Sequence, residues 1–311
     1  MAEKMATRQA YGKVLAQLAE TNPNIVVLDA DLSGSTMTKE FANVAPQRFF
    51  NMGIAEQNMY GAAAGLAHSG KVAIASTFAM FAAGRAFEII RNSIGYTHAN
   101  VKICATHAGL TVGEDGASHQ AIEDIALMRT IPGMTVLNPA DGQSAMELIR
   151  AAAEMDGPVY VRLGRAAVEG IYEADASFKI GKGICVRDGS DATIIATGIM
   201  VGEALKAADQ LCQAGIKVRV IDMHTIKPID REIIVRAAKE TGAIVTAEEH
   251  SIIGGLGSAV AEVTAQECPV KMKMVGVRDT FGESGTPAQL LKKYSLTADD
   301  LCTAVREVLQ P

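Results

Sequence analysis

Short runs of apolar and β-branched residues recur along the first half of the chain, and most of the segments between them show helical spacing. The runs lie at 25–30, 49–54, 72–77, 101–106, 134–139 and 159–163. Between them, apolar residues at positions i, i+3 and i+4 predict helices, with examples at 56–68, 80–93 and 142–153. Strands that alternate with helices at this rhythm predict a parallel β-sheet with helices on its faces.

Residues 169–190 interrupt this rhythm. They are polar and contain several glycines, so we interpret them as a linker with room for one short strand. The sequence therefore predicts an α/β protein with two domains, at 1–168 and 191–311, each with a mostly parallel sheet flanked by helices. In the second domain, strands are expected at 192–198, 218–223, 243–250 and 271–277, and helices near 200–214, 230–240 and 256–267, with two more at the C-terminus.

Composition narrows the classes of function. A length of 311 residues fits about two domains, and an apolar content of 49% is enough to build their cores. The net charge is -6 and no basic stripe is present, which argues against nucleic-acid binding. The five cysteines are scattered and lack C-x-x-C spacing, which argues against a disulfide framework or a zinc site.

The sequence also carries no targeting signal that we recognise. No apolar stretch reaches the roughly 18 residues of a membrane span, and the first residues lack the apolar core of a signal peptide. We therefore expect a cytoplasmic protein with reduced thiols that does not bind a membrane.

Polar residues gather where the predicted strands of the first domain end. They lie at 29–36, 53–57, 76–81 and 106–120. In open parallel sheets, ligands bind outside the carboxyl ends of the strands. These four groups are therefore the candidate chemistry of the chain.

Each of these groups, taken alone, also has an ordinary structural explanation. Glu56 would be favoured by the dipole at the start of a helix, and Phe78 and Phe81 could be core residues three positions apart. The remaining candidates could be helix caps, turns or buried structural histidines: Asp31, Ser35, His107, His119 and the stretch 113–116.

The order of these groups along the chain resembles the second half of a transketolase. Residues 48–56, RFFNMGIAE, resemble the segment that carries the family's catalytic glutamate, and residues 76–81, STFAMF, resemble the aromatic stretch beside the cofactor's aminopyrimidine. GEDGASHQ at 113–120 is similar to the family's Gly-Glu-Asp-Gly-Pro-Thr-His-Gln loop, and DTFGES at 279–284 is similar to a string near its C-terminus. The match runs in order through nearly the whole chain, and the last two strings are the more specific.

The resemblance begins partway through a full transketolase. The missing first half normally holds the diphosphate and its magnesium, with a Gly-Asp-Gly signature that this sequence lacks. Diphosphate-bound magnesium needs oxygen ligands and a loop that admits the phosphates. The resemblance therefore implies the second subunit of a split transketolase, whose partner chain carries the Mg²⁺ ligands, in an α2β2 assembly. We expect no metal ligands on this chain.

The resemblance implies thiamine diphosphate as the cofactor. Glu56 would hydrogen-bond N1′ of the pyrimidine as the catalytic glutamate. Phe81 would stack on that ring with Phe78 close by, and Asp31 would lie near the cofactor. The family often has tyrosine where this chain has Gly84, so one wall of the pocket differs.

The same resemblance indicates which residues would bind the sugar phosphate substrate. His119 and Asp115 would contact hydroxyls near the reacting carbons, and His119 could also move protons near neutral pH, as a second catalytic residue. Arginine suits the far end of the substrate because its guanidinium binds phosphate through two hydrogen bonds, although structural salt bridges would also explain these arginines. The phosphate-binding candidates are Arg8, Ser35, His107 and Arg165.

The implied reaction transfers a two-carbon ketol unit from a ketose phosphate to an aldose phosphate. Two related thiamine diphosphate enzymes remain as alternatives. The stretch 53–57 resembles 1-deoxyxylulose-5-phosphate synthase, and the β subunit of a 2-oxo acid dehydrogenase also depends on a partner. Phe81, where the synthase has arginine, and the loop at 113–120 favour transketolase. A non-catalytic scaffold is a further class, disfavoured because Glu56 and His119 are retained.

The second domain offers one candidate of its own. Glu248-Glu249-His250 follow a predicted strand, and the glycine-rich turn at 254–257 opens a helix. A nucleotide or another anion could bind at such a helix start. The resemblance instead implies that this domain is mainly structural and contacts other subunits.

Overall fold

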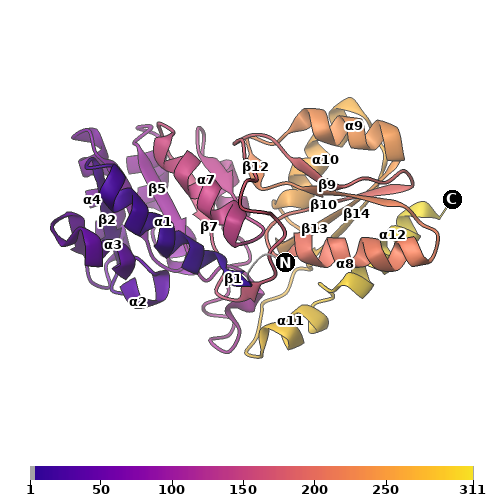
Figure 1. The fold of residues 1–311 in the computed structure, drawn as a ribbon, viewed down its shortest axis with the longest axis horizontal. Helices are drawn as coiled ribbons and strands as arrows, with labels where there is room; N and C mark the ends of the chain where they lie inside the picture. The colour runs from indigo at the N-terminus through magenta and orange to yellow at the C-terminus, as the bar shows by residue number, and fades with distance from the viewer. Residues whose placement is uncertain (1–3, 311) are drawn as a thin grey trace.

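The computed structural model describes residues 4–310. Figure 1 shows two α/β units side by side, the N-terminal one running from indigo to magenta and the C-terminal one from orange to yellow. Each contains a mostly parallel sheet flanked by helices, which confirms the predicted fold class. Within residues 4–310, no helix is long and apolar enough to cross a membrane.

The first sheet has the strand order β12-β6-β7-β5-β4-β2-β3. All its neighbouring strands are parallel except β12 and β6, which pair antiparallel. Every strand predicted in the first domain is present, as β2 (Ile25–Asp29), β3 (Phe49–Asn51), β4 (Val72–Ser76), β5 (Val101–Ala105), β6 (Thr135–Leu137) and β7 (Val159–Arg162). The edge strand β12 (Thr225–Lys227) was not predicted.

Helices cover both faces of this sheet. Alternate residues of a strand point to opposite faces, so Ile25 and Val27 enter one core while Val26 and Leu28 enter the other. Because both faces are buried, the strands read as continuous apolar runs. The first core lies under α1 (Thr7–Thr21), α3 (Lys39–Val44) and α7 (Gly142–Glu154), and the second under α4 (Glu56–His68) and α6 (Asp124–Thr130); α2 (Ser33–Thr36), η1 (Pro46–Arg48) and η4 (Leu110–Val112) are short connections.

The segment predicted as one regular helix at 80–93 differs from that prediction. It consists of two π-helical turns, η2 (Phe81–Arg85) and η3 (Ile90–Gly95), with α5 (Phe87–Ile89) between them. A π turn holds one residue more than an α turn and redirects the side chains that follow it. As a result, Phe81 and Arg85 stand at the two ends of a single wide turn.

The second sheet has the strand order β14-β13-β10-β11-β9. Only β9 is antiparallel to its neighbour, and it is the short strand allowed for in the predicted linker. The strands are β9 (Ile184–Arg187), β10 (Ala192–Ala196), β11 (Val218–Asp222), β13 (Ala243–Ser251) and β14 (Lys271–Val277). One face is covered by α8 (Met200–Gln213) and α12 (Ala298–Leu309), the other by α9 (Arg231–Thr241) and α10 (Leu256–Glu267), and α11 (Pro287–Lys293) lies against η4 of the first unit.

Secondary structure also joins the two units. β12 comes from the second half of the chain but extends the first sheet, and the backbone N–H of Asn138 donates a hydrogen bond to the His224 carbonyl over 2.8 Å. At the start of the chain, β1 (Met5–Ala6) pairs with β8 (Ala167–Val168). The units therefore share strands as well as a surface, while the boundaries predicted at 168 and 191 stay a prediction.

Candidate functional site

The candidate side chains of the first unit follow the carboxyl ends of β4 and β5. Phe78 and Phe81 come after β4, His107 comes after β5, and His119 ends the loop that follows. The rings of Phe78 and His107 stack with centroids 3.8 Å apart, and those of Phe78 and Phe81 stack at 5.9 Å. The His119 ring meets Phe81 edge-on at 5.5 Å. We call these four residues the aromatic cluster.

Glu56 is the first residue of α4 and is buried, with 2% of its surface exposed. Its two carboxylate oxygens accept hydrogen bonds from one guanidinium nitrogen of Arg85, at 3.1 and 3.2 Å. The same guanidinium lies over the Phe81 ring, 5.0 Å from its centroid. Arg85 therefore connects the carboxylate to the aromatic cluster, a role that our sequence analysis missed.

The phosphate-binding candidates form a second, positively charged group. The Arg8 guanidinium donates to the Ser35 carbonyl over 2.7 Å, and burial together with the charge of Arg165 lowers the pKa of Arg8. Burial, followed by the charges of Arg8, Arg165 and His119, lowers the pKa of His107 to about 3. His107 is thus a neutral imidazole at physiological pH, and the positive charge at this end comes from the two arginines.

Arg165 also makes structural contacts. Its guanidinium donates to the Val112 carbonyl and pairs with Glu114 at 3.2 Å, where both side chains are substantially exposed. An exposed pair of this kind contributes little to stability and can be exchanged for a ligand. The salt-bridge explanation therefore holds for Arg165, while Arg8 forms no ion pair within the described part of the chain.

Two predicted site residues are not brought into contact with the others. Asp31 is exposed and has a φ of 64°, and its carboxylate accepts a hydrogen bond from Asn51. Asp115 is exposed at the tip of the loop. Asp29, which lies in the candidate group at 29–36 but was given no role, is buried. It accepts hydrogen bonds from the Leu32 amide and two threonine hydroxyls and so fixes the start of the 31–36 segment.

The loop at 113–120 is held in place by the DTFGES segment of the second unit. Gln120 is buried, and its side-chain amide donates to the Leu110 carbonyl and to the Glu283 carbonyl, at 3.0 and 2.9 Å. Gly116 has a φ of 77°, and a Cβ there would lie 2.5 Å from the Ser284 hydroxyl. The two sequence strings that were most specific are therefore in direct contact, and His119 immediately precedes Gln120.

The Glu248-Glu249-His250 triplet does not form an anion site. The Glu248 carboxylate itself accepts the amides of Leu256 and Gly257, at 2.7 and 2.8 Å, and so occupies the start of α10. The interpretation of this turn as a nucleotide or anion site is wrong, because a protein carboxylate already fills it. Burial raises the pKa of Glu248 to about 7 and lowers that of His250 to about 4.

Glu249 points the other way, to the first unit. Its carboxylate accepts the Thr111 amide at 2.5 Å, and burial raises its pKa to about 7. Beside it, the buried Arg162 pairs with Asp124 at 2.9 Å and donates to the Glu249 carbonyl at 3.0 Å. The second unit therefore supports both ends of the loop region that carries His119.

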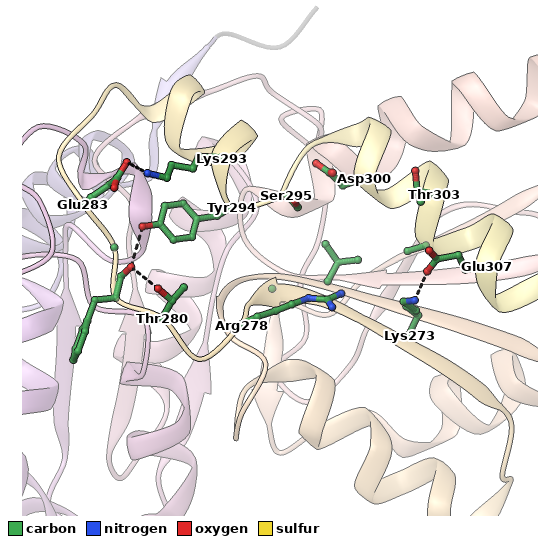
Figure 2. Close-up of a pocket in the computed structure, with 15 residues that line it drawn as sticks. Lys273, Arg278, Thr280, Glu283, Lys293, Tyr294, Ser295, Asp300, Thr303 and Glu307 are labelled. Atoms are coloured by element: carbon green, nitrogen blue, oxygen red, sulfur yellow. Dashed lines mark hydrogen bonds and ion pairs between the residues drawn. The ribbon is translucent and has the colours of Figure 1, made fainter.

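A separate cavity of about 670 Å³ lies in the second unit, shown in Figure 2. It opens beside the DTFGES segment, where the Tyr294 hydroxyl donates to the Phe281 carbonyl over 2.9 Å. Two of its lysines, Lys273 and Lys293, already pair with glutamates of the same wall. Since none of its residues belongs to the aromatic cluster, this cavity is distinct from the candidate site.

The residues present suit an aromatic, hydrogen-bonding ring and not a metal. A buried carboxylate next to flat apolar faces can accept a ring N–H and exclude water around it. Within residues 4–310, no group of three or more His, Cys, Asp or Glu side chains could hold a metal ion. The site can therefore take a flat ring that hydrogen-bonds a carboxylate, such as the pyrimidine of a cofactor.

Comparison with known proteins identifies the family of the chain. Residues 3–170 match the family described as the transketolase pyrimidine binding domain, and residues 181–301 match the transketolase C-terminal domain. A chain of Methanocaldococcus jannaschii, named for a transketolase C-terminal section, is 54% identical over 306 residues, covering 97% of this chain and 96% of that one. The 6-deoxy-6-sulfo-D-fructose transketolase subunit SqwH of Clostridium sp. is 43% identical over 303 residues, 97% of this chain and 94% of its own.

A solved structure is also similar along its whole length. The structure titled split gene transketolase, inactive beta4 tetramer, superposes with a TM-score of 0.93 at 59% identity, and 98% of each chain is covered. Both family matches and this full-length similarity agree with the resemblance seen in the sequence. The chain belongs to the transketolase family and corresponds to the half that carries the pyrimidine-binding and C-terminal domains.

Proposed function

We propose that this chain is the second subunit of a thiamine diphosphate-dependent transketolase that transfers a two-carbon ketol unit from a ketose phosphate to an aldose phosphate. The observation that supports it is the buried Glu56 carboxylate at the edge of the aromatic cluster. In this proposal a partner chain holds the diphosphate and Mg²⁺, and the two chains form an α2β2 assembly in the cytoplasm.

Glu56 and the phenylalanines would act on the pyrimidine. Glu56 would share a proton with N1′. Phe81 and Phe78 would hold the ring between apolar faces and exclude water. When bound, thiamine diphosphate supplies the carbon nucleophile of the reaction, and the protein contributes position and electrostatics. Asp31 would lie farther out, near the cofactor.

The remaining residues would bind the sugar phosphate. His119, in edge-on contact with Phe81, would contact a substrate hydroxyl and move protons near the reacting carbons, and Asp115 would bind a second hydroxyl. At the other end, Arg8 and Arg165 would bind the phosphate. His107 would donate a hydrogen bond as a neutral imidazole, with Ser35 beside Arg8.

The test is turnover of xylulose 5-phosphate and ribose 5-phosphate with thiamine diphosphate and Mg²⁺. The chain would be assayed alone and together with the chain that carries the diphosphate-binding half. We expect activity only in the mixture. Activity of this chain alone would contradict the partner requirement, and a mixture that assembles but transfers no ketol unit would contradict the reaction.

Glu56→Gln tests the proposed catalytic group directly. General acid–base groups contribute about 100- to 10,000-fold to turnover, so we expect a loss of at least about 100-fold with the fold retained. Glu20→Gln is the matched control, because Glu20 is exposed near the end of α1. Near-normal turnover of the Glu56 variant would remove Glu56 from the mechanism.

A further inference from the structure

Arg85 lies where a ring bound by Glu56 and Phe81 would have to lie. Its guanidinium donates to both Glu56 oxygens at 3.1 and 3.2 Å and sits 5.0 Å from the Phe81 ring centroid. A guanidinium is planar, stacks on aromatic faces and donates N–H groups to carboxylates. A bound aminopyrimidine would compete with it for the Phe81 ring and for a Glu56 carboxylate oxygen, because N1′ would make one hydrogen bond to that carboxylate.

The backbone around Arg85 is fixed while its side chain is half exposed. The wide turn η2 places Phe81 and Arg85 at its two ends, and the side-chain amide of Gln57 donates to the backbone carbonyl of Arg85 over 3.3 Å. Among the described residues, the hydrogen bonds and the cation–π interaction of the guanidinium involve Glu56 and Phe81 alone, and 52% of the side chain is exposed. It can therefore turn outward to solvent without a change in the backbone.

Gly84 leaves this region open. A Cβ at Gly84 would meet only the Met80 sulfur, at an ordinary contact distance of 3.5 Å. The position where the family often has tyrosine therefore adds no wall to the site, and the neighbouring arginine side chain covers the carboxylate instead.

We propose that Arg85 is a positioning residue that takes the place of the aminopyrimidine when no cofactor is bound. It keeps the buried Glu56 carboxylate paired and directed at the Phe81 face, and the incoming ring displaces it toward solvent. This inference rests on the proposed function, because it assumes that the ring binds between Glu56 and Phe81.

The proposal predicts in which direction the removal of Arg85 changes the affinity for thiamine diphosphate. Removal of the guanidinium takes away a competitor for the ring site and leaves a buried carboxylate without a partner, which is unfavourable. Both effects favour the bound state over the free state. A half-exposed ion pair and an exposed cation–π contact are individually weak, so we expect Arg85→Met to bind thiamine diphosphate about three- to ten-fold more tightly.

The experiment is calorimetric titration of thiamine diphosphate into the assembled complex of this chain and its partner, with Mg²⁺ and without sugar. Arg85→Lys should bind with an intermediate affinity, because lysine keeps the charge but lacks the planar face. Arg91→Met is the matched control, since Arg91 is exposed in η3 and bonds only Asn92, and should bind like the wild type. Equal or weaker binding by Arg85→Met would overturn the proposal.

Stability of the chain alone gives a second readout that needs no turnover. Arg85→Met should lower the midpoint of thermal unfolding by about 1–2 °C, and Glu56→Gln in the same chain should restore it, because no buried charge is then left unpaired. A midpoint unaffected by Arg85→Met would overturn the pairing role.

The outcomes separate the two proposals. If the wild-type complex binds thiamine diphosphate and Arg85→Met does not bind it more tightly, the Arg85 proposal fails and the proposed function stands. If the assembled wild-type complex binds no thiamine diphosphate, the proposed function fails and the Arg85 proposal fails with it.

Discussion

Glu249→Gln should change how the stability of this chain depends on pH. Glu249 is buried between the two units, and its carboxylate accepts the Thr111 amide at 2.5 Å. Gly109 is required beside it, because a Cβ there would collide with the carboxyl group. Glutamine keeps the shape and the acceptor, and its amide can donate to the Thr111 hydroxyl, which has no hydrogen-bond partner among residues 4–310.

The size of the effect follows from the shift in pKa. Burial raises the pKa of Glu249 from 4.5 to about 7, and each pKa unit corresponds to about 1.4 kcal/mol. The folded state therefore holds its proton more tightly than the unfolded state. Its contribution to stability is complete below pH 4.5 and is lost as the pH rises to about 7. Over that window the wild type should lose about 3 kcal/mol that the glutamine variant keeps.

The assay is urea unfolding of both proteins at several values between pH 4 and pH 8. Subtraction of one curve from the other cancels the histidines and the other buried carboxyl groups, which titrate in both. The free energy of unfolding of the variant should gain about 3 kcal/mol on the wild type between pH 4.5 and pH 8. Glu154→Gln, at an exposed position at the end of α7, is the control. A difference that does not vary with pH would refute the reasoning.

The remaining predictions concern the loop and the contact between the units. His119→Ala should raise KM for the sugar phosphates or lower turnover and leave the Kd of thiamine diphosphate unchanged; unaltered kinetics would remove its role. Asp124→Ala leaves the buried Arg162 cation without its partner and should cost about 3–5 kcal/mol in urea unfolding, whereas a loss below 1 kcal/mol would mean that water reaches the pair. Gly116→Ala, at a φ of 77° and in collision with Ser284, should cost at least about 1–2 kcal/mol and lower turnover, and wild-type stability would show that the loop can move away.

The sequence predicted the elements that repeat a pattern over many residues. The helix expected at 56–68 is α4, and the apolar runs of the first domain are the strands of its sheet. Three-residue β12 carries no periodicity, so nothing in its sequence indicates that it pairs with β6 in the other unit. The π turns were missed for a related reason, since apolar spacing does not distinguish a turn that holds one extra residue.

The site was predictable as a set of positions but not as a set of contacts. Phe78, Phe81, His107 and His119 meet as their order along parallel strands implied. The Arg85–Glu56 pair depends on the turn η2, which redirects a side chain that ordinary helical spacing would place elsewhere. The sequence signal for this pair was Arg85 four positions after Phe81. Charged residues follow aromatic ones at this spacing too often for the pattern to indicate a contact.

The carboxylates of the second unit show why the sequence alone left an anion site open as an alternative. Glu248 and Glu249 are adjacent on β13, and adjacent strand residues point to opposite faces. One therefore caps α10 while the other reaches the first unit, and neither is left for an outside anion. Alternation along the strand was visible in the sequence, but the identity of each face depends on how the units pack.

These contacts give the second unit a role in the position of the loop that carries His119. Glu249 holds Thr111 at one end of the loop, and the Glu283 carbonyl holds Gln120 at the other, next to His119. Neither Glu249 nor Glu283 reaches the aromatic cluster, yet both restrict where His119 can lie. A loop fixed at both ends by another unit keeps its geometry only while the units stay packed. If the loop binds the sugar phosphate as proposed, disruption of that packing should weaken sugar binding before it affects the Glu56 pocket, which is built within the first unit.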